Sequence, residues 1–173
     1  EEPVPEAKRG GYRSWLGSDI LEFTSDAYKT VVYDEACEPV MLPGYRSDGL
    51  FDAAIRFAAD HVDEPFYLFL SLIEPHHQNE VDAYPAPEGY EERYQGRWIP
   101  PDLATLSADG GTAHRHLGGY LGQIRRVDEG LGRLFDALRS MGLLDETIVA
   151  YTSDHGSHFK TRNGEDKRSC HDG

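Results

Sequence analysis

The sequence predicts an α/β fold in which a mostly parallel sheet is flanked by helices. Two observations support this prediction. A helical pattern followed by a short apolar run occurs twice, within residues 47–73 and again within residues 112–153. Each apolar run is followed directly by a polar loop that contains histidines. Strands that alternate with long helices favour a parallel sheet, because the helix returns the chain to the start of the next strand.

Composition indicates one domain, or a piece of one. The chain has 173 residues, of which 39% are hydrophobic and 11% aromatic, so it can form a packed core despite a net charge of -14. This acidity argues against nucleic acid and anionic membranes as partners, because both are bound by clustered Lys and Arg. The longest apolar run is far shorter than a membrane span, and the first residues show no hydrophobic signal-peptide region. Oligomeric state and compartment stay open.

The first helix is expected after an irregular connecting region, residues 1–46, which contains a short strand within residues 29–35. Ser47 or Asp48 would cap this helix, which would run to about His61. Its apolar side chains recur at helical spacing and form one broad stripe, made of Leu50, Phe51, Ala54, Ile55, Phe57 and Ala58.

The remaining elements follow in order. Pro65 ends the helical region, and the apolar run at 66–73 predicts a buried strand. Residues 74–111 form a long loop, a length that is usual for a functional loop or a lid. A second helix is expected over about 112–141 and ends at Gly142, and the run at 146–153 predicts the second buried strand.

Both polar loops should meet at one edge of the sheet. They are "EPHHQN" at 74–79 and "SDHGSHFKTRN" at 153–163. Ligands bind outside the carboxyl ends of parallel strands, so His76 and His77 should approach Asp154, His155 and Lys167. The sequence therefore predicts a site assembled from distant segments.

The residue types in these loops suit an anionic ester. The Asp154 carboxylate suits Ca2+ or Mg2+, and His155 could bind the same cation or a substrate oxygen; the alternative is that both residues only close a turn. Lys167 could hold a sulfate or phosphate group, or lie in a solvated charged loop. His76 and His77 could protonate a leaving oxygen, or act only as structural hydrogen-bonding groups.

Other candidate residues carry less weight. Cys37, in "CEPVM", is followed two residues later by a proline, as in a nucleophile motif, but it is not expected to be a nucleophile. His114 and His116, two residues apart on a helix, point away from each other and are not expected to form a metal pair. Four aromatic residues of the long loop could form the base of a sugar-binding groove or could anchor the loop onto the core: Tyr84, Tyr90, Tyr94 and Trp98.

Together, "PFYLFLSLIEPHHQN", "TIVAYTSDHG" and "FKTRNGEDKRSCHDG" resemble the sulfatase branch of the alkaline phosphatase superfamily, over residues 47–173. This resemblance implies an alkaline-phosphatase-like sulfatase fold and makes residues 47–173 part of a sulfatase catalytic domain. It implies that Asp154 and His155 bind Ca2+ (or Mg2+), and that Lys167 contacts the sulfate and the leaving group. It also implies that His76 lies near the leaving group, with His77 as the alternative if the register differs by one.

The resemblance further implies the reaction and its substrate. His77, Lys167 and His171 would contact a sulfated small molecule or carbohydrate during metal-assisted hydrolysis of a sulfate ester. Family members carry a C-x-P-x-R or S-x-P-x-R motif whose Cys or Ser becomes formylglycine, and Cys37 has Met41 where the arginine belongs. We therefore expect a middle fragment, inactive alone. The alternatives are a phosphodiesterase or phosphonate monoester hydrolase of the same superfamily, or a non-catalytic anion-binding module.

Overall fold

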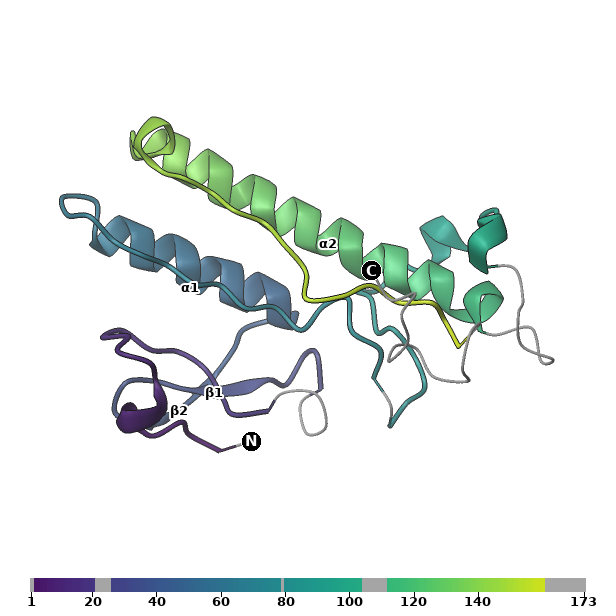
Figure 1. Ribbon diagram of the computed structural model, residues 1–173, viewed down its shortest axis with the longest axis horizontal. Coiled ribbons are helices and arrows are strands. Elements are labelled where there is room, and N and C mark those ends of the chain that lie inside the picture. Colours follow the sequence, from purple (N-terminus) through teal and green to yellow (C-terminus); the bar gives the residue numbers. More distant parts are fainter. Residues whose placement is uncertain (1, 21–25, 79, 104–111, 161–173) are drawn as a thin grey trace.

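The computed structural model describes residues 2–20, 26–78, 80–103 and 112–160 (Figure 1). Lys167 and His171, two of the predicted site residues, lie outside these ranges. The elements within these ranges are the strands β1 and β2, the helices α1 and α2, and four short 3-10 helices: Glu6–Lys8, Glu92–Tyr94, Pro101–Leu103 and Leu144–Glu146. No helix in the described ranges is both long and apolar enough to cross a membrane.

A small hairpin forms near the amino end. β1 (Val31–Tyr33) confirms the strand predicted within residues 29–35, and it pairs antiparallel with β2 (Pro39–Met41), which lies in the "CEPVM" stretch. Cys37 occupies the turn between them with a φ of 63°. Its Sγ accepts a hydrogen bond of 3.2 Å from Arg9, so this cysteine is held within the hairpin turn.

The helix α1 spans Arg46–Asp60 and confirms the predicted first helix. The predicted cap at Ser47 or Asp48 is wrong, because Tyr45 is the residue before the helix and no side chain caps it. The helix begins earlier because Arg46 is buried at its first position, where it forms a 3.0 Å ion pair with the buried Glu74. This long-range contact leaves no local sequence pattern.

The helix α2 spans Ala113–Ser140 and agrees with the predicted second helix. It lies beside α1 (Figure 1), and Phe51 packs directly against Gly130. A Cβ placed on Gly130 would lie 2.2 Å from the Phe51 ring, so glycine permits this close approach. Arg126 adds a bidentate ion pair with Asp48, with donor–acceptor distances of 2.8 and 2.6 Å.

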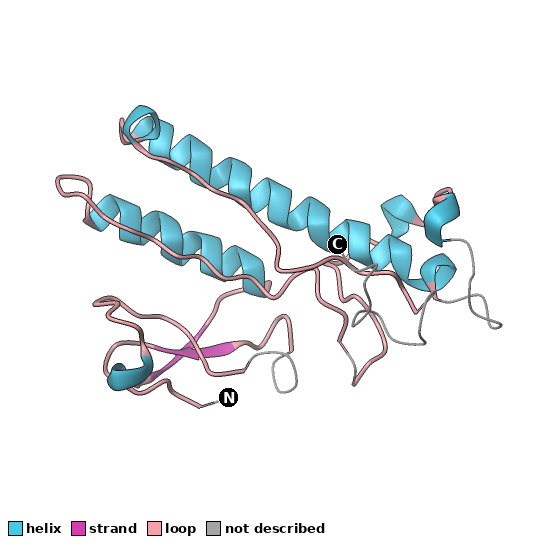
Figure 2. Cartoon of the chain, in the orientation of Figure 1, coloured by secondary structure: helices cyan, strands magenta, loops and turns pink. Residues whose placement is uncertain are grey.

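The predicted mostly parallel sheet is not present among the described residues. The only strands there are β1 and β2, which are antiparallel, while 66–73 and 147–153 are drawn as loops (Figure 2). A strand is defined by backbone hydrogen bonds to a neighbouring strand, and neither segment has such a partner in the described ranges. Both segments nevertheless run back along the helices in the same direction and converge (Figure 1).

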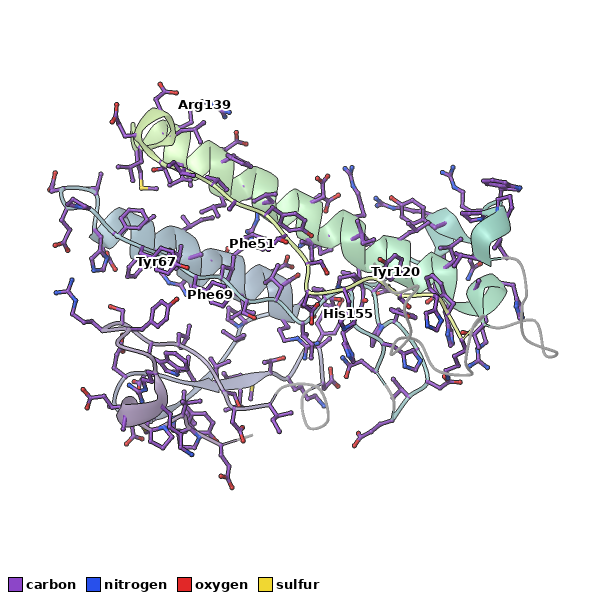
Figure 3. All side chains as sticks on the ribbon, in the orientation of Figure 1. Phe51, Tyr67, Phe69, Tyr120, Arg139 and His155 are labelled. Carbon is purple, nitrogen blue, oxygen red and sulfur yellow. The ribbon has the colours of Figure 1, made fainter. Side chains whose placement is uncertain are left out.

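The predicted burial of these two segments is also wrong for this chain. Tyr67 and Phe69 are 72% and 65% exposed, and Ile148 is 98% exposed. Figure 3 labels Tyr67 and Phe69 on the segment that follows α1. Buried apolar residues gather elsewhere, in two clusters: Val32, Leu42 and Leu50 in one, and Tyr84, Ala113 and Phe159 in the other.

Candidate active site

The described candidate residues line one cavity. It measures about 1180 Å3 and lies between the two extended segments and the helices α1 and α2. Its walls include the four predicted site residues that the structure describes: His76, His77, Asp154 and His155. His155 lies where the two segments converge (Figure 3). The two polar loops therefore meet as predicted, although the strands that were expected to carry them are not paired.

The loop that bears His76 and His77 is fixed to the start of α1. Glu74 is the first residue of this loop, and its Oε1 accepts a 3.0 Å hydrogen bond from Nε of Arg46. Burial raises the pKa of Glu74, and the positive charge of Arg46 opposes this rise. Breaking such a buried pair is costly, so the pair holds the loop in place.

His76 has a defined tautomer in the half-buried wall of the cavity. Its Nδ1 donates a hydrogen bond of 2.6 Å to the carbonyl oxygen of His77, because a carbonyl can only accept. The proton that His76 can exchange with a substrate is therefore the one at Nε2. This geometry suits a general acid whose ring orientation is fixed by the backbone.

Asp154 and His155 present two potential ligand atoms side by side. Oδ1 of Asp154 accepts the backbone N–H of His155 at 3.0 Å, and Oδ2 lies 3.6 Å from Nε2 of His155. His155 Nδ1 donates a hydrogen bond of 2.8 Å to the Gly156 carbonyl, which places the lone pair of the neutral ring on Nε2. Metal-binding histidines commonly donate their second ring N–H to a carbonyl in this way. The pair therefore fits a divalent cation.

Asp82 is a site residue that the sequence analysis missed. Its carboxylate accepts hydrogen bonds from Lys160, at 3.2 Å, and from Arg115, and it lies 3.1 Å from Nε2 of His77. Partial burial raises the pKa of Asp82, but the hydrogen bonds and charges of Lys160 and Arg115 outweigh this effect and lower it to about 2. Asp82 is thus an anion that positions His77.

His116 also joins this group. His116 is only 5% exposed, and its Nε2 accepts a hydrogen bond of 2.9 Å from Arg115. Burial and the charge of Arg115 lower the pKa of His116. His77, Asp82 and His116 place three potential ligand atoms within 4.8 Å of one another. They fit a cation poorly, because Arg115 and Lys160 already neutralise the single carboxylate.

Aromatic contacts hold the long loop onto α2. Tyr84 is buried against Tyr120 and Phe159, and its hydroxyl lies 2.8 Å from the Ser157 hydroxyl oxygen. Tyr90 donates a 2.6 Å hydrogen bond to Glu129 of α2. For these two tyrosines the structure supports anchoring of the loop. Ser157 contacts Tyr84 across 73 residues, a contact that the sequence pattern did not indicate.

The comparison with protein families identifies the chain. The profile of the Sulfatase family matches residues 5–172. The chain belongs to the sulfatase family. This family is part of the alkaline phosphatase superfamily, and the resemblance stated from the sequence is confirmed.

Individual sulfatases give the same result. The chain is 32% identical over 122 residues to the uncharacterized sulfatase YdeN of Escherichia coli, a match that covers 69% of this chain and 18% of YdeN. It is 26% identical over 156 residues to the ulvan-active sulfatase of Formosa agariphila, which covers 88% of this chain and 29% of that protein. The chain thus spans less than a third of the length of either sulfatase.

A solved structure supports the fold. The structure of a Bacteroides fragilis protein assigned to the sulfatases, yidJ, superposes with a TM-score of 0.78 at 24% identity. The match covers 95% of this chain and 36% of that protein. The chain therefore has the sulfatase fold over its own length, and it corresponds to part of a full-length sulfatase.

Proposed function

We propose that this chain forms part of the active site of a metal-assisted sulfuric ester hydrolase. The observation that carries the proposal is the cavity of about 1180 Å3, which brings His76 and His77 together with Asp154 and His155. Membership of the sulfatase family supports the same reaction. One relative is named for its activity on ulvan, so we favour a sulfated carbohydrate as the substrate class.

Asp154 and His155 would hold the cation, which we propose to be Ca2+ or Mg2+. Oδ2 of Asp154 and Nε2 of His155, 3.6 Å apart, supply two ligand atoms, and further oxygen ligands would come from the rest of the enzyme. A cation bound there would neutralise negative charge on the sulfate oxygens. Calcium prefers oxygen, so His155 could instead contact a sulfate oxygen directly.

The cavity residues supply the other roles in the proposed reaction. His76 protonates the leaving oxygen through Nε2, and His77, whose Nε2 donates to Asp82, contacts the substrate. Lys167 and His171, outside the described residues, are proposed to contact the sulfate and the leaving group. The printed sequence contains neither C-x-P-x-R nor S-x-P-x-R, so the formylglycine nucleophile is proposed to lie elsewhere in the full-length enzyme.

The test is Asp154→Ala in the full-length enzyme, assayed on para-nitrophenyl sulfate with and without added Ca2+. We expect kcat/KM to fall on the order of 100-fold and the response to Ca2+ to disappear, since one cation ligand is lost. The matched control is Asp145→Ala, at an exposed aspartate of the 3-10 helix that precedes the same segment. Turnover equal to that of the control would show that Asp154 binds no catalytic cation.

The same assay separates the alternative reactions. Another relative, 23% identical over 196 residues, is the multifunctional alkaline phosphatase superfamily protein PehA of Trinickia caryophylli. Faster hydrolysis of bis(para-nitrophenyl) phosphate than of the sulfate would favour a phosphodiesterase. No hydrolysis of either ester would favour the anion-binding module.

A further inference from the structure

A second cavity lies beside the candidate active site. It measures about 520 Å3 and is formed by the loop around the 3-10 helix Glu92–Tyr94 and by the first turns of α2. Its lining includes Glu91, Tyr94, Arg97, His114 and Arg115. Apart from Arg115, which contacts Asp82, none of these residues has a role in the proposed hydrolysis. The cavity is therefore available for another part of the substrate.

The charged groups in this cavity suit an anionic sugar. The guanidinium of Arg97 stacks on the ring of Tyr94, with its Cζ 5.7 Å from the centroid, and it has no ion pair in the part of the chain that the structure describes. A guanidinium oriented by stacking binds carboxylate or sulfate in two parallel hydrogen bonds. His114 adds a second donor, and the Glu91 carboxylate accepts hydrogen bonds from hydroxyl groups.

An exposed tryptophan follows the arginine. Trp98 is 74% exposed, whereas Tyr84 is buried and Tyr90 is hydrogen-bonded to α2. Of the two roles considered for the loop aromatics, anchoring thus accounts for Tyr84 and Tyr90 and not for Trp98. Trp98 does not line the 520 Å3 cavity, so it is not assigned to the subsite.

Arg115 connects this cavity with the candidate active site. It lines the 520 Å3 cavity, and its Nη2 donates to Asp82. Asp82 in turn contacts His77 and Lys160, which both line the 1180 Å3 cavity. The two cavities are therefore linked by one ion pair, so a single extended molecule can contact both.

We propose that the 520 Å3 cavity is a subsite for an anionic group on the sugar next to the sulfated one. Arg97, which lines the cavity, binds the carboxylate or sulfate of that neighbouring sugar. The substrate class is then an anionic oligosaccharide or polysaccharide rather than an isolated sulfate ester. This inference rests on the proposed function, because it assigns the active-site cavity to the scissile sulfate.

The experiment compares Arg97→Gln with the wild-type full-length enzyme on two kinds of substrate. One is para-nitrophenyl sulfate, and the other is a set of sulfated, uronate-containing tetrasaccharides from ulvan, heparan sulfate and chondroitin sulfate. For the tetrasaccharide that the wild type hydrolyses best, we expect kcat/KM to fall about 10- to 100-fold, the loss typical of a hydrogen bond to a charged group. We expect the rate on para-nitrophenyl sulfate to stay unchanged.

The matched control is Arg93→Gln. Arg93 belongs to the same loop and stacks on Tyr90 at 4.7 Å, but it does not line the cavity. Its kinetics should equal those of the wild type on every substrate. An Arg97→Gln variant that also keeps wild-type kinetics on the tetrasaccharide would overturn the subsite while leaving the sulfatase assignment intact.

A binding measurement distinguishes failure of the subsite from failure of the proposed function. If the wild type hydrolyses no ester, calorimetric titration with the same tetrasaccharides still tests the cavity. Binding that weakens about 10-fold in Arg97→Gln and not in Arg93→Gln would support the subsite without hydrolysis. Equal binding by the wild type and both variants, or no binding by any of them, would overturn it.

Discussion

At the scale of single residues, Asp82 links three separate parts of the chain. It contacts His77 on its own loop, Arg115 on α2 and Lys160 near the end of the described chain. Because the pKa of Asp82 is lowered to about 2, its carboxylate is ionised at any physiological pH and holds these groups. We therefore regard Asp82 as a positioning residue, because it acts on the substrate only through its neighbours.

Asp82→Asn tests this role. We expect kcat on para-nitrophenyl sulfate to fall on the order of 10-fold with a smaller change in KM, because His77 loses a charged partner and its orientation becomes less well defined. Asp82→Glu should recover part of the rate. Asp128→Asn is the control, since Asp128 is an exposed acid on α2 that forms a 3.8 Å ion pair with Arg125. Equal kinetics for Asp82→Asn and Asp128→Asn would remove Asp82 from the site.

Which site residues the sequence could predict depends on how far apart their contacts are. His76, His77, Asp154 and His155 follow apolar runs directly, so their place in one cavity could be predicted from local order. Asp82 and Arg115 are separated by 33 residues, and their contact leaves no spacing pattern. Ion pairs of this kind can be identified only when the position of the long loop on α2 is known.

At the scale of elements, the packing of α1 on α2 depends on Gly130. A Cβ at this position would lie 2.2 Å from the Phe51 ring, which is buried and cannot move freely. We expect Gly130→Ala to destabilise the enzyme by about 1–3 kcal/mol, the usual cost of overpacking a core. Thermal unfolding of the full-length enzyme would measure this loss as a lower Tm.

Gly132 supplies the comparison on the same helix. A Cβ there would meet no atom within 4 Å, and the residue is exposed. Gly132→Ala should therefore raise stability by about 0.5–1 kcal/mol, through the better helix propensity of alanine. If both variants change Tm in the same direction, the packing of Phe51 on Gly130 does not limit stability.

The two helices were predictable and the sheet was not, for a physical reason. A helix satisfies its backbone within itself, so the spacing of apolar residues is enough to place α1 and α2. A strand needs a partner, and 66–73 and 147–153 have none in the described part of this chain. Apolar composition indicated extended backbone in both segments, but it could not supply the neighbouring strand.

At the scale of the whole molecule, the chain presents large apolar side chains on two extended segments that have no strand partner among the described residues. Tyr67, Phe69, Ile148 and Tyr151 are the most exposed of them. Extended backbone with open hydrogen-bonding groups and apolar side chains pairs readily with other copies. We expect the chain, produced alone, to self-associate despite its charge of -14.

A double variant tests this expectation. Tyr67→Lys with Phe69→Lys should lower the average mass seen by static light scattering, because lysine on an open strand opposes edge pairing. Trp98→Lys removes an aromatic residue of similar exposure, 74%, that lies outside both segments, and it should leave the mass unchanged. A wild-type chain that scatters as a monomer would contradict the expectation.

The buried pair between Arg46 and Glu74 has a consequence for how mutational data on this protein should be read. The pair joins the first residue of α1 to the loop that carries His76. A small displacement of α1 is therefore transmitted to the residue proposed to protonate the leaving group. Turnover therefore depends on the position of α1 as well as on the catalytic residues. A mutational scan that measures activity alone would count packing residues of α1 as catalytic ones.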